Sequence, residues 1–165
     1  MKTMNDLTLH FLQDIYYAER QILKALPKMA KAAESQELKQ AFLHHREETE
    51  GQIERLQKAF EAFGKSARGT TCEAINGLIE EGEDVIGAFD TGPVRDAALI
   101  ACAQAVEHYE MARYGALIAW CKGAGGHREV VNLLEQTLEE EKKADTLLNK
   151  LANEDVNRKA SQKAA

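Results

Sequence analysis

The sequence predicts an all-α protein, a four-helix bundle in which one long crossover contains a short fifth helix. Ala, Leu, Glu, Lys and Gln dominate the 165 residues, and no alternating pattern rich in β-branched residues persists. Gly, Pro and Ser positions divide the chain into four long helical segments and one short one. Helical composition, missing strand pattern and the spacing of the breaks therefore agree on the fold class.

The first two helices are delimited by a cap, a short break and a glycine. An Asn5–Asp6 cap begins a helix that runs to about residue 33. Pro27 lies inside this segment, so we expect a kink or an end there. A second helix is predicted over about 37–63, with Gly64 terminating it just beyond its last turn.

The remaining helices follow from proline and glycine positions. A short helix is predicted over about 72–89, and Pro93 suits the first turn of a long helix over about 94–122. A last helix is predicted over about 128–153. The break between the last two helices is expected at Gly123, Gly125 and Gly126.

The lengths of the connections predict the topology. The first two helices, and likewise the last two, are joined by a few residues, so each pair is an antiparallel hairpin. About thirty residues separate the hairpins, enough to travel the length of the bundle. One long crossover is the ferritin-like arrangement. We expect a single domain over residues 1–156 and a polar, disordered tail over 157–165.

Charge and hydropathy exclude several classes of function. Lys and Arg total 21 against 27 Asp and Glu, a net charge of −6, so the chain is not expected to bind nucleic acid. No apolar run approaches the ~20 residues that span a bilayer. The N-terminus carries no apolar secretion segment, and the 3 cysteines form neither a metal pair nor an even disulfide set. A cytoplasmic location is therefore expected.

Polar side chains interrupt the apolar face of every long helix at about mid-length. Isolated carboxylates in a low-dielectric core are costly, and several together repel one another. A pair of metal ions removes both problems, because hard cations prefer oxygen ligands. A boundary glutamate that reaches solvent and pairs with Lys or Arg is the alternative for each. The candidate metal ligands are Glu19, Glu48, Gln52, Glu107, Glu110, Glu141 and Asp145.

The Glu-x-x-His motif common in such centres is absent. The pairs Glu48/Gln52 and Glu141/Asp145, each four residues apart on one helix face, would have to replace it. His45 faces inward and is interpreted as a core histidine or as support for a ligand.

Seven runs carry a resemblance to a known family: DIYYAERQ at 14–21, ETEGQIERL at 48–56, CEAI at 72–75, GLIEE at 77–81, RDAALI at 95–100, VEHYE at 106–110 and TLEEEK at 137–142. On these runs the chain resembles the YciE/YciF family of ferritin-like bacterial stress proteins over nearly its whole length, to about residue 157. The resemblance implies a ferritin-like bundle, a homodimer, a di-metal centre and a role in stress responses. It maps the metal set onto Glu19, Glu48, Glu107, Glu110 and Glu141, with Gln52 and Asp145 as weaker members.

Two hypotheses from different classes remain open. In the first, two iron or manganese ions lie mid-bundle, bridged by Glu48 together with Glu110 or Glu141, and react with peroxide or oxygen. In the second, the chain is a structural or protein-interaction bundle without catalysis, and its acids are paired with Lys, Arg or water. A large storage cage is not favoured, because nothing in the sequence points to its several interfaces.

Overall fold

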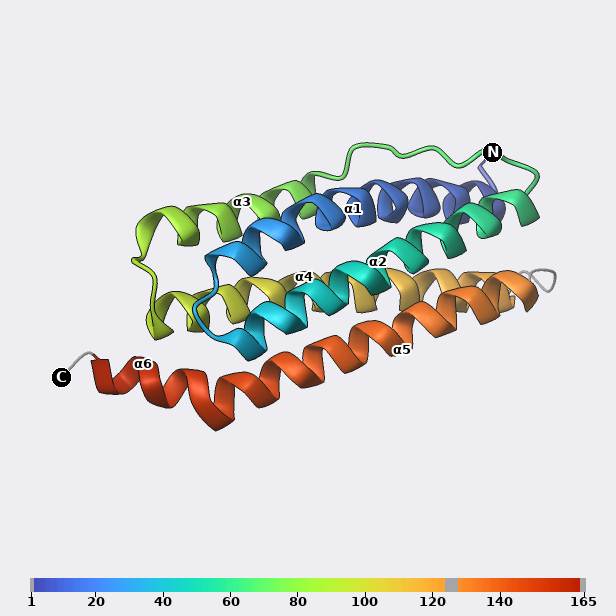
Figure 1. Ribbon diagram of the computed structural model, residues 1–165. Helices are drawn as coiled ribbons and strands as arrows, with labels where there is room; N and C mark the ends of the chain where they lie inside the picture. The colour runs from blue at the N-terminus through green and yellow to red at the C-terminus, as the bar shows by residue number, and fades with distance from the viewer. Residues whose placement is uncertain (1, 124–127, 164–165) are drawn as a thin grey trace.

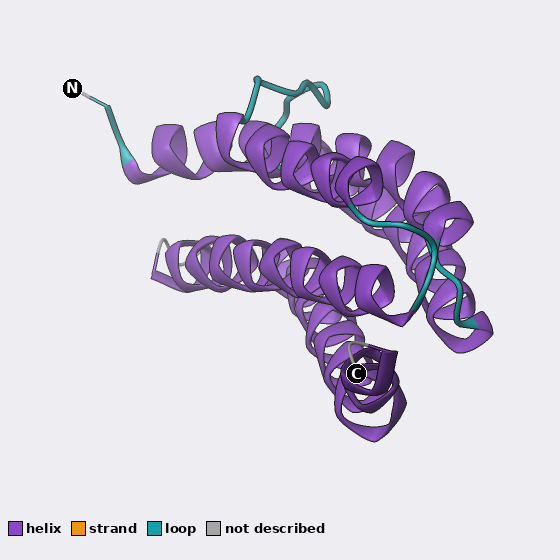
Figure 2. Cartoon of the chain, turned by 90° about the vertical axis from the view of Figure 1, so that its left-hand side faces the viewer, coloured by secondary structure: helices purple, strands orange, loops and turns teal. Residues whose placement is uncertain are grey.

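The computed structural model describes residues 2–123 and 128–163, and this part of the chain is built of helices and loops without strands (Figures 1 and 2). The all-α prediction is confirmed. Of the glycine break, Gly123 is the last residue of a helix, and Gly125 and Gly126 lie outside the described residues. The elements are α1 (Met4–Ala32), α2 (Gln36–Ala62), α3 (Glu73–Ala88), α4 (Pro93–Gly123), α5 (Arg128–Leu151), a π-helical turn (Ala152–Val156) and α6 (Asn157–Lys163).

Helix α1 ends near residue 33 as predicted, but its N-cap and the effect of Pro27 differ from the prediction. Thr3, and not Asn5, is the N-cap, and it forms a capping box with Asp6. Pro27 does not end the helix, which continues to Ala32. Pro27 is exposed, so solvent can replace the hydrogen bond that its missing N–H would have made. The burial of Leu26 and Ala30, on an adjacent face, favours helix on both sides of the proline.

The crossover begins at the end of α2 as predicted. Gly64 has φ +64° just after the C-cap Phe63, and its N–H donates to the Glu61 carbonyl at 2.8 Å. Glycine adopts this left-handed conformation without steric cost. The following loop runs back along α1, and α3 completes the path to the start of α4 (Figure 1).

The four long helices form a closed ring of contacts. Helix α1 packs on α2, α2 on α5, α5 on α4, and α4 on α1. Helix α3 lies outside this ring against α1 and α4, and it covers about half their length (Figure 1). Two antiparallel hairpins joined by one long crossover are the predicted ferritin-like arrangement.

The tail expected to be disordered over 157–165 is helical from Asn157 to Lys163. A π-helical turn buries Ala152 and Val156, and α6 then packs against α4. The two buried apolar side chains anchor the segment, whose polar composition alone indicated a frayed end. No helix among the described residues has the length and hydropathy needed to cross a membrane.

Towards each end of the bundle the core is apolar. Leu12, Leu56 and Leu134 are completely buried in one half, and Leu38 and Leu99 in the other. The carboxylate of Asp96, 2% exposed, is also buried in the second half. It accepts hydrogen bonds from the backbone N–H groups of Glu34 and Ser35, both at 2.8 Å, and so fixes α4 to the turn between α1 and α2.

Candidate metal centre

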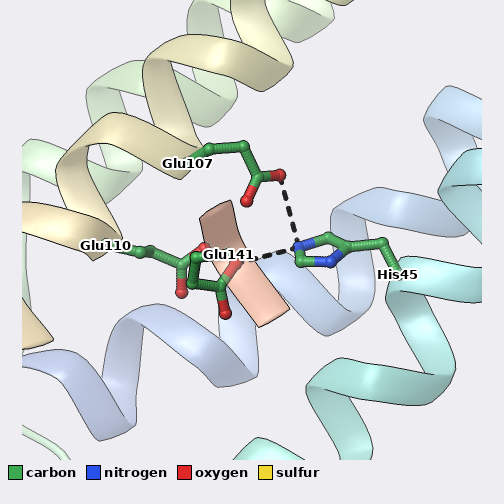
Figure 3. Close-up of side chains that lie close together, drawn as sticks. All are labelled: His45, Glu107, Glu110 and Glu141. Atoms are coloured by element: carbon green, nitrogen blue, oxygen red, sulfur yellow. Dashed lines mark ion pairs between the residues drawn. The ribbon is translucent and has the colours of Figure 1, made fainter. Parts of the chain in front are cut away.

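Five ionisable side chains meet at mid-length inside the ring, and we call them the central cluster: Glu19, His45, Glu107, Glu110 and Glu141. They come from all four long helices. Helical periodicity places them here, because each lies on the buried face of its helix. Four members, His45, Glu107, Glu110 and Glu141, each offer one ligand atom within 4.8 Å of the others (Figure 3).

His45 is the one nitrogen donor of the central cluster. Its Nε2 lies 3.4 Å from Glu107 Oε1 and 3.7 Å from Glu141 Oε2. Its Nδ1 faces the opposite way and lies 3.5 Å from Glu48 Oε2. A carboxylate on the second ring nitrogen is the usual partner of a metal-ligating histidine, where it fixes the tautomer and the ring orientation.

Glu19 is linked to the other acids through Tyr114. The Tyr114 hydroxyl donates to Glu19 Oε1, and both side chains are completely buried. This bond holds the Glu19 carboxylate beside Glu141, whose charge acts on its titration, and beside Glu110, which is within hydrogen-bonding reach of it.

The electrostatics show how unfavourable the charged cluster is without a cation. Burial, followed by the charge of Glu141, raises the pKa of Glu19 to about 8 against the opposing Tyr114 hydrogen bond. Burial and neighbouring carboxylates raise the pKa of Glu110 well above its ordinary value. Burial also raises the pKa values of Glu107 and Glu141, although His45 opposes it. Each acid is therefore protonated more readily in the folded chain than in water.

The pKa of His45 is also raised, but for a base a raised pKa favours the charged form. Burial alone lowers its pKa, but the surrounding carboxylates, Glu107 first, outweigh burial and raise it to about 10. A buried imidazolium thus neutralises part of the acid charge. One positive charge among four buried carboxylates leaves the rest to be neutralised by protons or by metal.

Most polar atoms of the central cluster lack a hydrogen-bond partner among the described residues. This holds for both oxygens of Glu110 and Glu141, for one oxygen each of Glu19 and Glu107, and for both nitrogens of His45. Buried polar groups in native proteins are almost always partnered. Converging, unpartnered oxygen and nitrogen donors are what a cation such as iron or manganese requires, so the residues present fit the implied metal.

Three of the residues predicted from sequence lie outside the central cluster. The half-buried Glu48 contacts His44 and His45 at the edge of the cluster, and its charge acts on Glu141. The buried Gln52 donates from Nε2 to Glu140 at 3.2 Å. Asp145 accepts from Gln104 at 3.1 Å and lies 3.3 Å from His108 Nε2, at the surface. The structure brings together Glu19, Glu107, Glu110 and Glu141.

His45 is the member that the sequence analysis did not include among the ligands. The expected motif was glutamate followed three residues later by histidine. Helix α2 carries the same two residue types at the same spacing in the opposite order, His45 and then Glu48. An inward histidine at mid-helix, next to a glutamate one turn away, was the signal available.

Two cavities reach the central cluster from different sides, and both are lined by His45 and Glu107. The first, about 30 Å³, lies beneath α3 and has apolar walls that include Ile22, Leu78 and Val106. The second, about 150 Å³, lies between α2 and α5. Its lining combines apolar side chains with His44, Glu48 and Lys143.

Fold and site together define a ferritin-like helical bundle with a buried histidine–carboxylate cluster at its centre. The chain belongs to the family described as a domain of unknown function, DUF892, whose family model matches residues 3–161. Protein YciF of Escherichia coli strain K12 is 47% identical over 165 residues, covering 99% of each chain. The resemblance found in the sequence is therefore confirmed.

Solved structures agree with this assignment. The crystal structure of the E. coli stress protein YciF matches with a TM-score of 0.91, over 96% of this chain and 100% of that one. YcfI from Rhodopseudomonas palustris is 52% identical and matches with a TM-score of 0.87, over 90% and 94% of the two chains. A Xanthomonas campestris protein at 22% identity, with a TM-score of 0.77, shares the fold.

Proposed function

We propose that the protein binds two divalent metal ions, iron or manganese, in the central cluster. The observation that carries this proposal is the set of converging, unpartnered ligand atoms of His45, Glu107, Glu110 and Glu141 within 4.8 Å. Charge supports two ions, because the four buried glutamates carry −4 when ionised and two divalent ions balance that charge. Ligand chemistry alone does not separate iron from manganese.

The surrounding residues would hold and shield such a centre. Glu107, Glu110, Glu141 and Glu19 would supply the carboxylate oxygens, and His45 the nitrogen. Glu48 at His45 Nδ1 and Tyr114 at Glu19 would orient these ligands. The completely buried Leu99 and Leu134 belong to the apolar core that encloses the site.

Iron or manganese in this place would supply redox chemistry towards oxygen or peroxide, which suits a stress-response role like that named for the relative YciF. The apolar cavity beneath α3 is the route suited to dioxygen, a small uncharged molecule. Its volume of about 30 Å³ exceeds the ~10–15 Å³ that one water molecule needs.

The experiment is elemental analysis of protein purified without chelator and then loaded anaerobically with Fe(II) or Mn(II). We expect about two ions per chain, with a large loss in Glu107→Ala and in Glu141→Ala. The matched control is Glu140→Ala, which removes a neighbouring acid that pairs with Arg55 outside the central cluster. Unchanged metal content in both cluster variants would contradict the proposal.

A structural bundle without metal is the second candidate. The observation in its favour is that the His45 imidazolium can pair with Glu107 and Glu141, which neutralises part of the cluster without a cation. In that case loading with metal leaves the melting temperature unchanged.

We also propose a homodimer, which light scattering of the purified protein tests directly.

A further inference from the structure

Side chains of the type that binds metals form a line from the solvent to the central cluster. Their exposed fractions fall along it: 65% for His44, 21% for Glu48, 7% for His45 and 3% for Glu107. His44 Nε2 lies 3.4 Å from Glu48 Oε1, and Glu48 Oε2 lies 3.5 Å from His45 Nδ1. His45 Nε2 then lies 3.4 Å from Glu107 Oε1. Each step is short enough for a cation to keep a protein ligand while it moves inward.

The same four side chains line one cavity. It has a volume of about 150 Å³ between α2 and α5, with Ala144 and Leu148 among its apolar walls. His45 is 7% exposed, and its ring nitrogens face only the carboxylates of Glu48, Glu107 and Glu141, at 3.4–3.7 Å. The cavity therefore leads from an exposed histidine–carboxylate pair to a buried histidine that lies between carboxylates.

The cavity beneath α3 is unsuited to this task. It reaches His45 and Glu107 as well, but its walls are almost entirely apolar. A divalent ion would have to shed its water there without replacement ligands, at a cost far above that of a route with carboxylate and imidazole donors.

We propose that His44 and Glu48 form a cation entrance, a second metal-binding site that captures a divalent ion at the surface and passes it through His45 to the central cluster. This inference rests on the proposed metal centre. It adds a site with its own function, because His44 governs how fast the centre fills and not how much metal it holds.

Replacing Lys143 should change the loading rate in the direction opposite to replacing His44. It lines the same cavity, and its charge is one of those acting on Glu48. A positive charge at the entrance repels an incoming cation, so Lys143→Gln should speed loading. His44→Ala, which removes an exposed ligand, should slow it.

The chain also offers a matched control pair. His108, 66% exposed, lies 3.3 Å from Asp145 on another part of the surface, with nearly the same exposure and chemistry as His44 and Glu48. Neither His108 nor Asp145 lines either of the two cavities that reach the central cluster. His108→Ala removes the same kind of side chain without touching the proposed route.

The test is stopped-flow loading with Co(II), followed by its visible absorption, with cobalt content measured at the end. Electrostatic guidance changes association rates by about tenfold or more. We expect His44→Ala to load about tenfold more slowly than wild type, Lys143→Gln to load faster, and both to reach the wild-type content. His108→Ala should load at the wild-type rate.

Separate outcomes overturn the two proposals. A His44→Ala rate equal to wild type, or an equal slowing in His108→Ala, overturns the entrance and leaves the metal centre standing. A wild-type chain that takes up no cobalt overturns the metal centre and the entrance with it. Mn(II) added to Glu141→Ala gives a second readout, since it should broaden the NMR signals of His44 but not those of His108. Equal broadening overturns the entrance.

Discussion

Two regions of the core bury carboxylates and treat them differently. At one end of the bundle, both oxygens of Asp96 accept backbone N–H groups at 2.8 Å. At mid-bundle, no backbone, amide or hydroxyl donor reaches either oxygen of Glu110 in the described part of the chain, and its neighbours are the carboxyl groups of Glu19, Glu107 and Glu141. Burial is similar, 2% and 0% exposed, so the surroundings make the difference. The fold supplies donors where a carboxylate fastens two segments, and it leaves acids without donors where a cation would complete them.

Metal removal should have the largest effect of the predicted changes, because it affects the central cluster and not Asp96. A ligand present at about 1,000 times its Kd stabilises the folded state by about 4 kcal/mol. For a chain of this size, that corresponds to a fall in melting temperature of about 10 °C when a chelator removes the metal. Differential scanning calorimetry of loaded and chelated protein measures it. An identical melting temperature in both states would show that the central cluster is satisfied without metal.

Asp96→Ala should act on stability alone. The substitution leaves two N–H groups at a helix start without their charged acceptor, at a cost of about 3 kcal/mol. Metal content should stay at the wild-type value. Urea unfolding with elemental analysis tests both parts, and Asp96→Asn, which keeps one acceptor oxygen, should lose less. A change in metal content would mean that the two regions are coupled.

Glu110→Gln should raise the stability of the metal-free protein and weaken metal binding, the reverse of Asp96→Ala. In the metal-free protein it removes a buried acid with no donor, so unfolding should require about 2 kcal/mol more than in wild type. The same substitution removes a ligand oxygen, so the loaded variant should lose the stabilisation by metal. Urea unfolding without Mn(II) measures the expected gain in stability, and urea unfolding with Mn(II) measures the expected loss of stabilisation by metal. A metal-free variant weaker than wild type would indicate that Glu110 is partnered by something other than metal.

The metal-free protein should lose stability as pH rises. The folded-state pKa of Glu19 is about 8 against an ordinary 4.5, so between these values the folded chain holds a proton that the unfolded chain has released. His45, with a pKa of about 10 against 6.5, extends the trend in the same direction.

The loss should be about 1 kcal/mol for each pH unit within the Glu19 window. Urea unfolding at pH 5, 6.5 and 8, compared between wild type and Glu19→Gln, cancels the surface groups that both share. The advantage of the variant should grow with pH. An advantage that is constant from pH 5 to 8 would mean that Glu19 titrates normally.

The bundle could be predicted from sequence because its determinants are local. Apolar periodicity fixed the helices, and connection lengths fixed the pairing and the crossover. The C-terminal helix could not be predicted, because its formation depends on Ala152 and Val156 finding a surface on the rest of the bundle. The helix end considered at Pro27 does not occur for a related reason, since tertiary packing keeps α1 helical on both sides of it.

In the candidate site, too, the sequence predicts what depends on local helix geometry and not what depends on packing between helices. A helical projection gives the direction of a side chain, which placed Glu19, Glu107, Glu110 and Glu141 inward. It does not show what lies opposite on another helix. Asp145 faces Gln104 and His108, and Glu48 lies behind His45, so neither is part of the central cluster. Those partners become visible only when the helices are assembled.

The central claim is that cations complete the unpartnered acids at mid-bundle. Crystals soaked in Mn(II) and measured for anomalous scattering test it most directly. We expect two anomalous peaks among Glu19, His45, Glu107, Glu110 and Glu141, and none beside the satisfied carboxylate of Asp96. Peaks confined to surface carboxylates, with the central cluster empty, would contradict the account.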